Sequence, residues 1–332
     1  MKKSLLKYIC CLYCKEELGL QNIKKSQNKE IIDGELFCKQ CRRIYPVFRG
    51  VPRILPDNLE ERKLSIANAF GYEWKNFNKL HTLYQKQFLD WIYPVKGESL
   101  KGKVVLDAGC GKGRHVYYSA KLGASDVIGI DLSDSVDIAY YHTKMFRNAH
   151  IIQADIYNLP FRCSFDFIYS IGVLHLLHEP ATGFRSIMKF LGEKGLITAW
   201  VYSYENNEWI LKYINPLRKL ITSRMQYPIL KLLCTTFTLF YLYPVLKLIY
   251  KPINNHMKYI SNCLFYNDYL FYLSEFKFRD INCTVFDHLV APEAHYLKEG
   301  EFKRWFLENN LKDIKITMRM KSGWKGYGRK NN

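Results

Sequence analysis

The sequence predicts an α/β protein in which helices cover both faces of a parallel sheet, with a small metal-binding unit at the N-terminus. Three observations predict this fold. Strand and helix patterns alternate between residues 101 and 205, and such alternation is typical of parallel sheets. A glycine-rich turn follows the first of these strands, Val104-Val105-Leu106, and two CxxC pairs lie near the N-terminus.

Composition is that of a folded protein of about two domains. The chain has 332 residues, of which 48% are hydrophobic and 24% charged, so a disordered chain is excluded. Lys and Arg number 49 against 31 Asp and Glu, which gives a net charge of +18. This charge favours binding to phosphate-rich partners or anionic membrane surfaces. A solvated surface without such a partner explains it equally well. The ten cysteines form no disulfide-like framework and indicate a reducing, cytoplasmic location. Lys7 interrupts the N-terminal apolar stretch, so no export signal is expected.

Residues 1–56 are predicted to form a zinc ribbon. Cys11 and Cys14 make one pair and Cys38 and Cys41 the other, separated by 23 residues. Two such pairs can converge on one tetrahedral ion, and four thiolates favour a closed, structural Zn²⁺ site. Cys10 is a rival ligand, but only Cys11 has the CxxC spacing.

The rest of the chain is predicted to divide into four parts. Residues 57–100 form an aromatic-rich helical linker or lid, 101–205 the core of the sheet, 206–298 a helical, aromatic-rich cap insertion, and 299–332 the C-terminal part of the sheet. Helices are expected at 114–122, from the N-cap Ser133 towards 145, at 181–191 and at 299–309. The strands are expected at 104–106, 127–130, from 151, and at 165–171, 195–202, 312–320 and 323–329.

The cap contains the most apolar segment of the chain. No charged residue lies between Leu232 and Leu246, and Lys231 and Lys247 bound the run. These 15 residues are fewer than the ~20 that a membrane-spanning helix needs, and Pro244 lies among them. We therefore expect no transmembrane span, and a buried or interfacial helix that could bring the cap into peripheral contact with a membrane.

The glycine-rich turn carries the chemistry. It reads Asp107-Ala-Gly109-Cys-Gly111-Lys-Gly113, so the backbone can turn tightly and a ligand can approach it. A dinucleotide site has the spacing Gly-x-Gly-x-x-Gly, which differs from this one. Asp107 would place negative charge near an ammonium group and not near a phosphate.

In these residues the sequence resembles the class I, Rossmann-like S-adenosylmethionine-dependent methyltransferases. Further motifs match in order: Asp131 ends the second strand, Gln153-Ala154-Asp155-Ile156 follows the third, and Ser170 to His175 leave the fourth. The resemblance implies a seven-stranded sheet, ribose binding by Asp131 and adenine contact at Asp155. The implied cofactor-binding residues are Asp107, Gly109, Gly111, Gly113, Asp131, Leu132, Asp155, Ile156 and Ser170.

Five side chains are candidates for the reaction centre or its pocket. His175 has a suitable pKa range for a general base, although packing alone would also explain it. Tyr72 and Trp74 could cover a sulfonium with their aromatic faces or belong to the core. Tyr202 and Asp287 could line the acceptor pocket or be structural.

The segments around the second CxxC pair carry another resemblance. Tyr45-Pro46-Val47 and Gly50-Val51-Pro52 resemble the small zinc-ribbon activator subunits of tRNA and protein methyltransferases. This resemblance implies that the ribbon packs on the catalytic domain or contacts the substrate.

The acceptor is expected to be a small molecule, a sugar or a lipid-linked precursor. The exit of the fourth strand reads Ser-Ile-Gly-Val, unlike that of amino-methylating base enzymes, and the aromatic cap suggests an enclosed apolar acceptor. The alternative is an rRNA or tRNA methyltransferase that binds RNA through its basic surface and its ribbon. A non-enzymatic sensor of the cofactor is disfavoured because Asp107, Asp131 and the glycines are intact.

Overall fold

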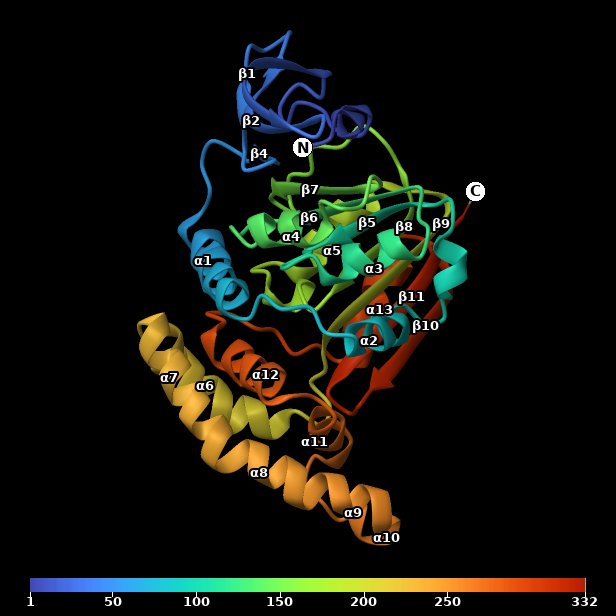
Figure 1. The fold of residues 1–332 in the computed structure, drawn as a ribbon. Coiled ribbons are helices and arrows are strands. Elements are labelled where there is room, and N and C mark those ends of the chain that lie inside the picture. The colour runs from blue at the N-terminus through green and yellow to red at the C-terminus, as the bar shows by residue number, and fades with distance from the viewer. Residues whose placement is uncertain (332) are drawn as a thin grey trace.

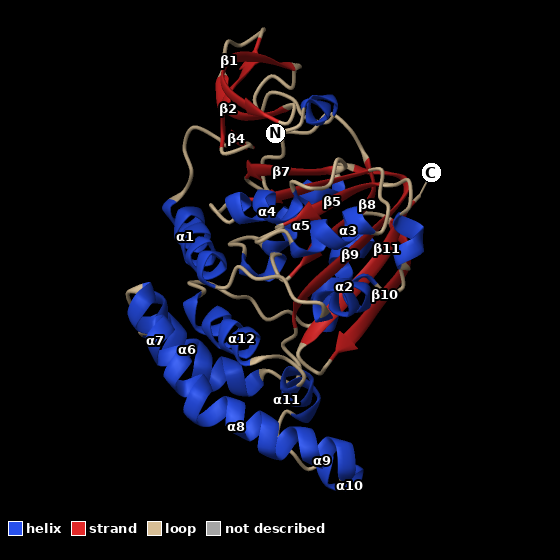
Figure 2. Ribbon diagram, in the orientation of Figure 1, coloured by secondary structure: helices blue, strands red, loops and turns tan. Residues whose placement is uncertain are grey.

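One eleven-stranded sheet runs through the computed structural model, which describes residues 1–331. Its seven-stranded part has the order β7-β6-β5-β8-β9-β11-β10, which confirms the predicted sheet (Figure 2). Strands β7 to β9 run parallel, whereas β11 is antiparallel to both of its neighbours. The bounds are β5 Val104–Ala108, β6 Asp126–Asp131, β7 Ala149–Ala154, β8 Phe165–Ile171, β9 Leu191–Tyr202, β10 Leu311–Arg319 and β11 Gly323–Lys330.

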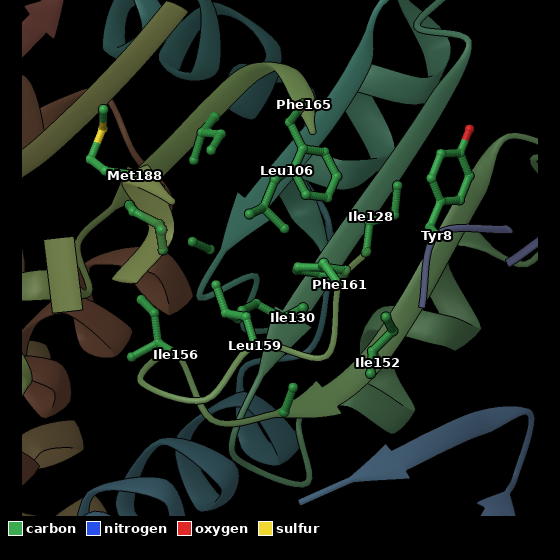
Figure 3. Packing of buried hydrophobic residues seen from close by; sticks show 14 of the residues in the cluster. Tyr8, Leu106, Ile128, Ile130, Ile152, Ile156, Leu159, Phe161, Phe165 and Met188 are labelled. Carbon is green, nitrogen blue, oxygen red and sulfur yellow. The ribbon is translucent and has the colours of Figure 1, made fainter. Parts of the chain in front are cut away.

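Two hydrophobic clusters cover the two faces of this sheet. Consecutive strand residues point to opposite faces, so Val105 belongs to one cluster and Leu106 to the other. The cluster of Leu106, with Ile128 and Phe165, is shown in Figure 3. Helices α2 Leu83–Ile92, α3 Arg114–Lys121 and α4 Val136–Thr143 pack on the first face, and α5 Pro180–Met188 and α13 Glu299–Glu308 on the second.

The start of α4 differs from the prediction. The helix begins at Val136 with Ser135 at the N-cap position, so Ser133 does not cap it. The Ser133 hydroxyl instead donates to the Asp131 carboxylate, at 2.6 Å. Ser133 therefore belongs to the turn that leaves β6.

The N-terminal ribbon extends the sheet. Its strands β1 Leu18–Gln27, β2 Glu30–Cys38, β3 Ile44–Phe48 and β4 Val51–Ile54 pair antiparallel to one another. Strand β4 then pairs parallel to β7, with Arg53 opposite Gln153 and Ile54 opposite Ala154. The ribbon is thus joined to the edge of the main sheet by backbone pairing (Figure 1).

The residues before the first CxxC pair strengthen this attachment. The backbone N–H of Cys10 donates to the carbonyl of Pro160 at 2.9 Å, and the N–H of Arg162 donates to the carbonyl of Tyr8 at 3.1 Å. The Tyr8 hydroxyl donates to Asp126 on β6 at 2.6 Å, and its ring lies at the margin of the same cluster as Phe161 (Figure 3). The ribbon and the main sheet therefore share one hydrophobic core.

The cap is helical, as predicted, but its main helix is longer than expected. A continuous helical run of 30 residues spans Tyr227–His256 and lies along the outer edge of the molecule, at the end opposite the ribbon (Figure 1). By length and composition this run could cross a membrane, and only 22% of its most apolar window is buried. The α-helices of the whole cap are α6 Asn215–Leu220, α7 Tyr227–Phe237, α8 Tyr243–Val245, α9 Lys251–His256, α10 Lys258–Ser261, α11 Asn267–Ser274 and α12 Phe278–Val290, and α7 to α9 belong to the continuous run.

Pro244 does not end the helix because the helix changes its hydrogen bonding before the proline. A π-helical turn, Thr238–Leu242, precedes Pro244, and a second one, Leu246–Tyr250, precedes Pro252. Proline lacks the N–H of the usual i to i−4 bond, and a wider turn accommodates that loss. The helix therefore extends beyond the 15 uncharged residues at both of their ends.

Candidate active site and metal centre

A cleft of about 260 Å³ opens at the carboxyl ends of β5, β6 and β8. Chain connections leave β5 and β8 in opposite directions here, which is where open α/β sheets bind ligands. The glycine-rich turn after β5 forms its floor, and one wall comes from α1 Glu61–Asn76. The cap contributes α12 and Tyr269 to the other wall.

Two glycines of the turn are required by geometry. Gly109 and Gly111 have φ values of +96° and +49°, which L-residues with side chains rarely adopt. A Cβ at Gly109 would lie 2.3 Å from Val173, and one at Gly111 would lie 2.9 Å from Nε1 of Trp74. The backbone is therefore exposed to the cleft at these positions.

Six of the nine predicted cofactor residues line the cleft. They are Gly109, Gly111, Asp131, Leu132, Asp155 and Ile156. The Asp131 carboxylate accepts hydrogen bonds from the N–H of Gly111 at 2.8 Å and of Ser133 at 2.9 Å. Burial raises the pKa of Asp131, and these hydrogen bonds oppose the rise. Asp155 accepts an ion-paired hydrogen bond from Lys63 of α1 at 3.0 Å.

Asp107, Gly113 and Ser170 do not line the cleft, contrary to their predicted roles. Asp107 is fully buried beneath the turn, and burial, with the nearby charge of Asp131, raises its pKa well above the usual range. Gly113 packs against the backbone of Ala139 on α4. The Ser170 hydroxyl donates to the carbonyl of Ala108 at 2.8 Å, inside the sheet.

Only one of the two predicted aromatic lid residues faces the cleft. Trp74 lines it, whereas Tyr72 packs against Tyr227 and Phe286 of the cap, with ring centroids 5.1 and 5.9 Å apart. Both residues lie on α1, and residues two positions apart on a helix point to different sides. The sequence could therefore have shown that the two could not share one role.

The far end of the cleft is an aromatic chamber formed by His175, Trp200, Tyr202, Tyr269 and Asp287. The rings of His175 and Tyr202 have centroids 4.0 Å apart, and the Tyr202 hydroxyl donates to Asp287 at 3.3 Å. Burial lowers the pKa of His175 well below its usual range and raises the pKa of Asp287 to about 6. His175 is therefore a neutral imidazole near pH 7.

Glu73 and Cys283 are cleft residues that the sequence reading missed. The Cys283 thiol donates to the Glu73 carboxyl at 3.3 Å. Burial, and then the charge of Asp287, raises the pKa of Glu73 well above its usual range. The spacing of Phe70, Glu73 and Trp74 on one helix face is the signal that could have placed Glu73 in the cleft.

Lys112 is a third residue that was missed. It is 2% exposed, and its Nζ donates to the carbonyl of Phe77 at 2.8 Å and lies 5.0 Å from the ring centroid of Trp74. Burial lowers the pKa of this amine to about 8. Lys112 ties the end of α1 to the glycine-rich turn, a role that no local sequence pattern indicates.

The four predicted metal ligands converge. The Sγ atoms of Cys11, Cys14, Cys38 and Cys41 all lie within 4.8 Å of one another, and Cys10 is outside this group. Tetrahedral thiolates bound at ~2.3 Å would lie roughly 3.8 Å apart, so the four sulfurs fit one ion. The prediction that these residues form one site is confirmed.

Comparisons with known proteins agree with this two-part organisation. Residues 106–199 match the family described as a methyltransferase domain, and residues 2–50 match the family described as Trm112p-like protein.

Two curated relatives carry the name tRNA U34 carboxymethyltransferase. The protein of Pseudoalteromonas translucida is 38% identical over 86 residues, 25% of this chain and 27% of that protein. The protein of Cellvibrio japonicus is 29% identical over 189 residues, 49% of this chain and 58% of that protein. The chain thus spans less than two thirds of the length of either relative.

A solved structure of magnesium protoporphyrin IX methyltransferase from Synechocystis PCC 6803 with bound SAH has a TM-score of 0.46 and 12% identity, over 81% of this chain and 98% of that chain. The sheet order of the present chain and its glycine-rich turn agree with the two family matches. The chain therefore joins a Rossmann-like, class I S-adenosylmethionine-dependent methyltransferase domain to an N-terminal Trm112p-like domain.

Proposed function

We propose that the protein is a methyltransferase that modifies tRNA. The observation that carries this proposal is the similarity to proteins named tRNA U34 carboxymethyltransferase, over up to 49% of the chain. The same finding corrects the sequence-based choice of acceptor. A small-molecule, sugar or lipid-linked acceptor was the wrong choice, and RNA, the alternative, replaces it as the partner.

The charges of the chain support an RNA substrate. The net charge is +18, and neutralising RNA phosphates releases counterions, which favours binding. The cleft itself contains basic side chains from three parts of the chain: Lys63 on α1, Arg114 after the glycine-rich turn and Arg319 at the end of β10. Lys63 and Arg319 are already paired, with Asp155 and Asp90, so the net charge of the whole chain is the main electrostatic support for a polyanionic substrate.

The aromatic chamber is suited to a single base. Enzymes that modify a base take it out of the stack and hold it between aromatic or apolar side chains. The rings of Trp200 and Tyr202 are nearly perpendicular, with centroids 5.4 Å apart, and those of Tyr202 and His288 are stacked at 5.4 Å. The Tyr202 ring already packs against His175, His288 and Tyr296, so a base would meet the chamber at its polar edge, where Tyr202 and Asp287 offer hydrogen bonds.

The turn and its surroundings fit S-adenosylmethionine, because side chains are excluded at Gly109 and Gly111 and the Asp131 carboxylate lies beside them. When bound, this cofactor supplies a methyl group on a sulfonium. We propose that Asp131 accepts a hydrogen bond from a ribose hydroxyl at Oδ2, because Oδ1 already accepts two hydrogen bonds from Ser133 and Oδ2 only one, from Gly111. Leu132 and Ile156 would flank the adenine, and the Trp74 ring would face the positive charge.

The reaction centre needs positioning more than acid–base chemistry. His175 remains the candidate for this role, because its imidazole is neutral and its buried Nδ1 has no hydrogen-bond partner among the described residues, so a ring nitrogen can accept a hydrogen bond from the acceptor. The carboxyl of Asp287, held by the Tyr202 hydroxyl, would orient the acceptor. Both roles are proposals that rest on the position of these residues in the chamber.

We also propose that the four-cysteine site holds Zn²⁺, since four thiolates in a closed arrangement favour a structural zinc ion. Free thiols and a tRNA substrate both suit the cytoplasm.

The experiment that tests the function uses the full chain, labelled S-adenosylmethionine, and separate samples of bulk tRNA, ribosomal RNA, and lipid and sugar extracts. We expect label in tRNA, and the mass of the digested nucleoside will distinguish a methyl from a carboxymethyl group. Label that appears only in ribosomal RNA or only in the extracts would contradict the proposal.

Cofactor binding is tested by Asp131→Ala, which we expect to abolish binding in calorimetry because the ribose loses its acceptor. The matched control is Asp134→Ala, three residues along, whose carboxylate is 64% exposed and pairs with Lys75. Unchanged affinity in Asp131→Ala would refute the cofactor assignment.

A further inference from the structure

The first two thirds of the cap, from residue 209 to residue 267, contain no acidic residue. Between Glu208 and Asp268 there is no Asp or Glu, and there are eight Lys or Arg residues. These are Lys212, Arg218, Lys219, Arg224, Lys231, Lys247, Lys251 and Lys258. This part of the chain is therefore strongly cationic at every physiological pH.

The inner side of the helix Tyr227–His256 is packed against the protein. Leu230, Cys234, Thr238 and Leu246 are buried at four-residue spacing or its multiple. The Asn282 side chain of α12 donates to the hydroxyl of Thr235 at 2.9 Å, and Lys247 donates to the carbonyl of Phe276 at 2.8 Å. These contacts fix the helix lengthwise along the cap.

The outer side of the same helix is apolar and exposed. Leu232 is 66% exposed, Phe240 68% and Leu248 75%. Apolar residues thus occur on both sides of the helix, on the side packed against the protein and on the side away from it. Other exposed apolar residues of this outer surface are Ile229, Leu233, Phe237, Leu239, Tyr241 and Ile249, and from the segment before it Tyr213, Leu217, Leu220 and Ile221.

This outer surface does not match an ordinary core helix, an RNA interface or a symmetric dimer. A core helix would be buried, whereas only 22% of this apolar window is buried. RNA interfaces are polar and charged, whereas Leu232 and Leu248 offer no hydrogen bonds. A second copy would bring two cationic segments together, which costs energy.

We propose that the outer surface of the cap lies on an anionic lipid bilayer, with the helix Tyr227–His256 in the plane of the membrane. Its leucine and phenylalanine side chains would enter the acyl boundary. The exposed cations Lys219, Arg224 and Lys258 would meet the anionic headgroups, a favourable contact for each charge. The inner-side hydrogen bonds hold the helix on the cap, so it lies on the bilayer and does not cross it.

The test is flotation of the full chain with vesicles of phosphatidylcholine containing one third phosphatidylglycerol, without RNA or cofactor. We expect the chain to float with these vesicles, and to float less with pure phosphatidylcholine or at high salt. The variant Leu232→Glu/Leu248→Glu should bind at least about tenfold more weakly, because two apolar side chains no longer enter the bilayer.

The matched control is Tyr141→Glu/Met145→Glu, which introduces the same charges at residues 66% and 72% exposed on and after α4, away from the cap. This control should bind vesicles like the unmodified chain, and both variants should retain the circular dichroism spectrum and transfer activity. Equal binding of the cap variant, no flotation at all, or a dimer that the cap variant dissociates would overturn the proposal. RNA is absent from the assay, so its outcome does not depend on the acceptor.

Discussion

The ribbon and the cap are both additions to the same seven-stranded sheet, but they are attached in opposite ways. The ribbon buries its apolar side chains against the sheet, for example Leu5 and Ile9, and adds backbone pairing between β4 and β7. The cap packs one side of a long helix and leaves the other side apolar and exposed, as at Leu248. Figure 1 shows the two at opposite ends of the molecule.

The burial of apolar side chains therefore distinguishes two kinds of added module. A module whose buried side chains join the core of the main domain, as those of the ribbon do while Ile44 and Phe48 stay exposed, belongs to the folding unit, and its removal should destabilise the whole chain. A module that exposes a large apolar surface is expected to bind a partner or a membrane there. Substitutions in the ribbon and in the cap should therefore have different consequences.

Loss of a metal ligand should have the largest effect. Cys38→Ala removes a buried ligand of the four-cysteine site, and we expect loss of bound zinc and a loss of several kcal/mol in the free energy of unfolding of the whole chain. Metal analysis and urea unfolding measure both. The control is Cys263→Ala, an exposed cysteine outside the site, which should change neither. A zinc-free variant of unchanged stability would show that the ribbon is not part of the folding unit.

The two sides of the cap helix should respond differently to truncation. Leu230→Ala removes a side chain that is 1% exposed and should cost about 2–5 kcal/mol. Leu232→Ala, two residues away on the outer side, should change stability by less than ~0.5 kcal/mol in the absence of membranes. Urea unfolding of both variants provides the measurement. Equal losses would mean that the outer side is covered in solution.

The polar attachment of the ribbon should be weaker than its apolar core. Asp126 accepts hydrogen bonds from Tyr8 at 2.6 Å and Lys7 at 3.0 Å, and lies 2.8 Å from Nε2 of His150. Asp126→Asn disturbs all three partners and should cost roughly 1–3 kcal/mol. Asp313→Asn, at an exposed ion pair with Arg329, should cost less than ~1 kcal/mol. Chemical unfolding compares the two, and similar small losses would show that the Asp126 cluster does not hold the ribbon.

Lowering the pH should gradually remove the contribution of Asp126 to the free energy of unfolding. Burial alone would raise the pKa of Asp126, but hydrogen bonds from His150, Tyr8 and Lys7 outweigh it and hold the pKa below the usual range. A depressed folded-state pKa stabilises the fold above the unfolded value of ~3.9 and loses this effect as pH falls. The stability difference between the unmodified chain and Asp126→Asn should therefore shrink below about pH 4. A difference that stays constant down to pH ~3 would contradict this assignment.

Much of the fold could be predicted because its signals are local. Alternating strand and helix patterns placed all seven strands, and the CxxC spacing selected Cys11 over Cys10. The pairing of β4 with β7 could not be predicted, because residues 100 positions apart carry no shared local pattern. The full length of the cap helix does not follow from its uncharged residues, because π-helical turns accommodate Pro244 and an inward hydrogen bond accommodates Lys247.

Several predicted site residues line the cleft because the backbone itself places them there. Gly109, Gly111 and Asp131 follow directly from strand ends and turn geometry. Tyr72 packs against the cap because residues two positions apart on a helix point to different sides. Asp107 is fully buried and does not line the cleft, and its role in cofactor binding stays a prediction. Lys112 was invisible, since its partner carbonyl at Phe77 lies 35 residues away.

The pairing of β4 with β7 protects one edge of the parallel sheet from aggregation. A parallel sheet that ended at β7 would present unsatisfied backbone groups to any passing strand, which is a route to aggregation. Here the protecting strand is synthesised before the edge that it covers and on the same polypeptide. Every copy of the chain therefore contains the strand that pairs with the β7 edge, and this protection does not depend on the concentration of another protein.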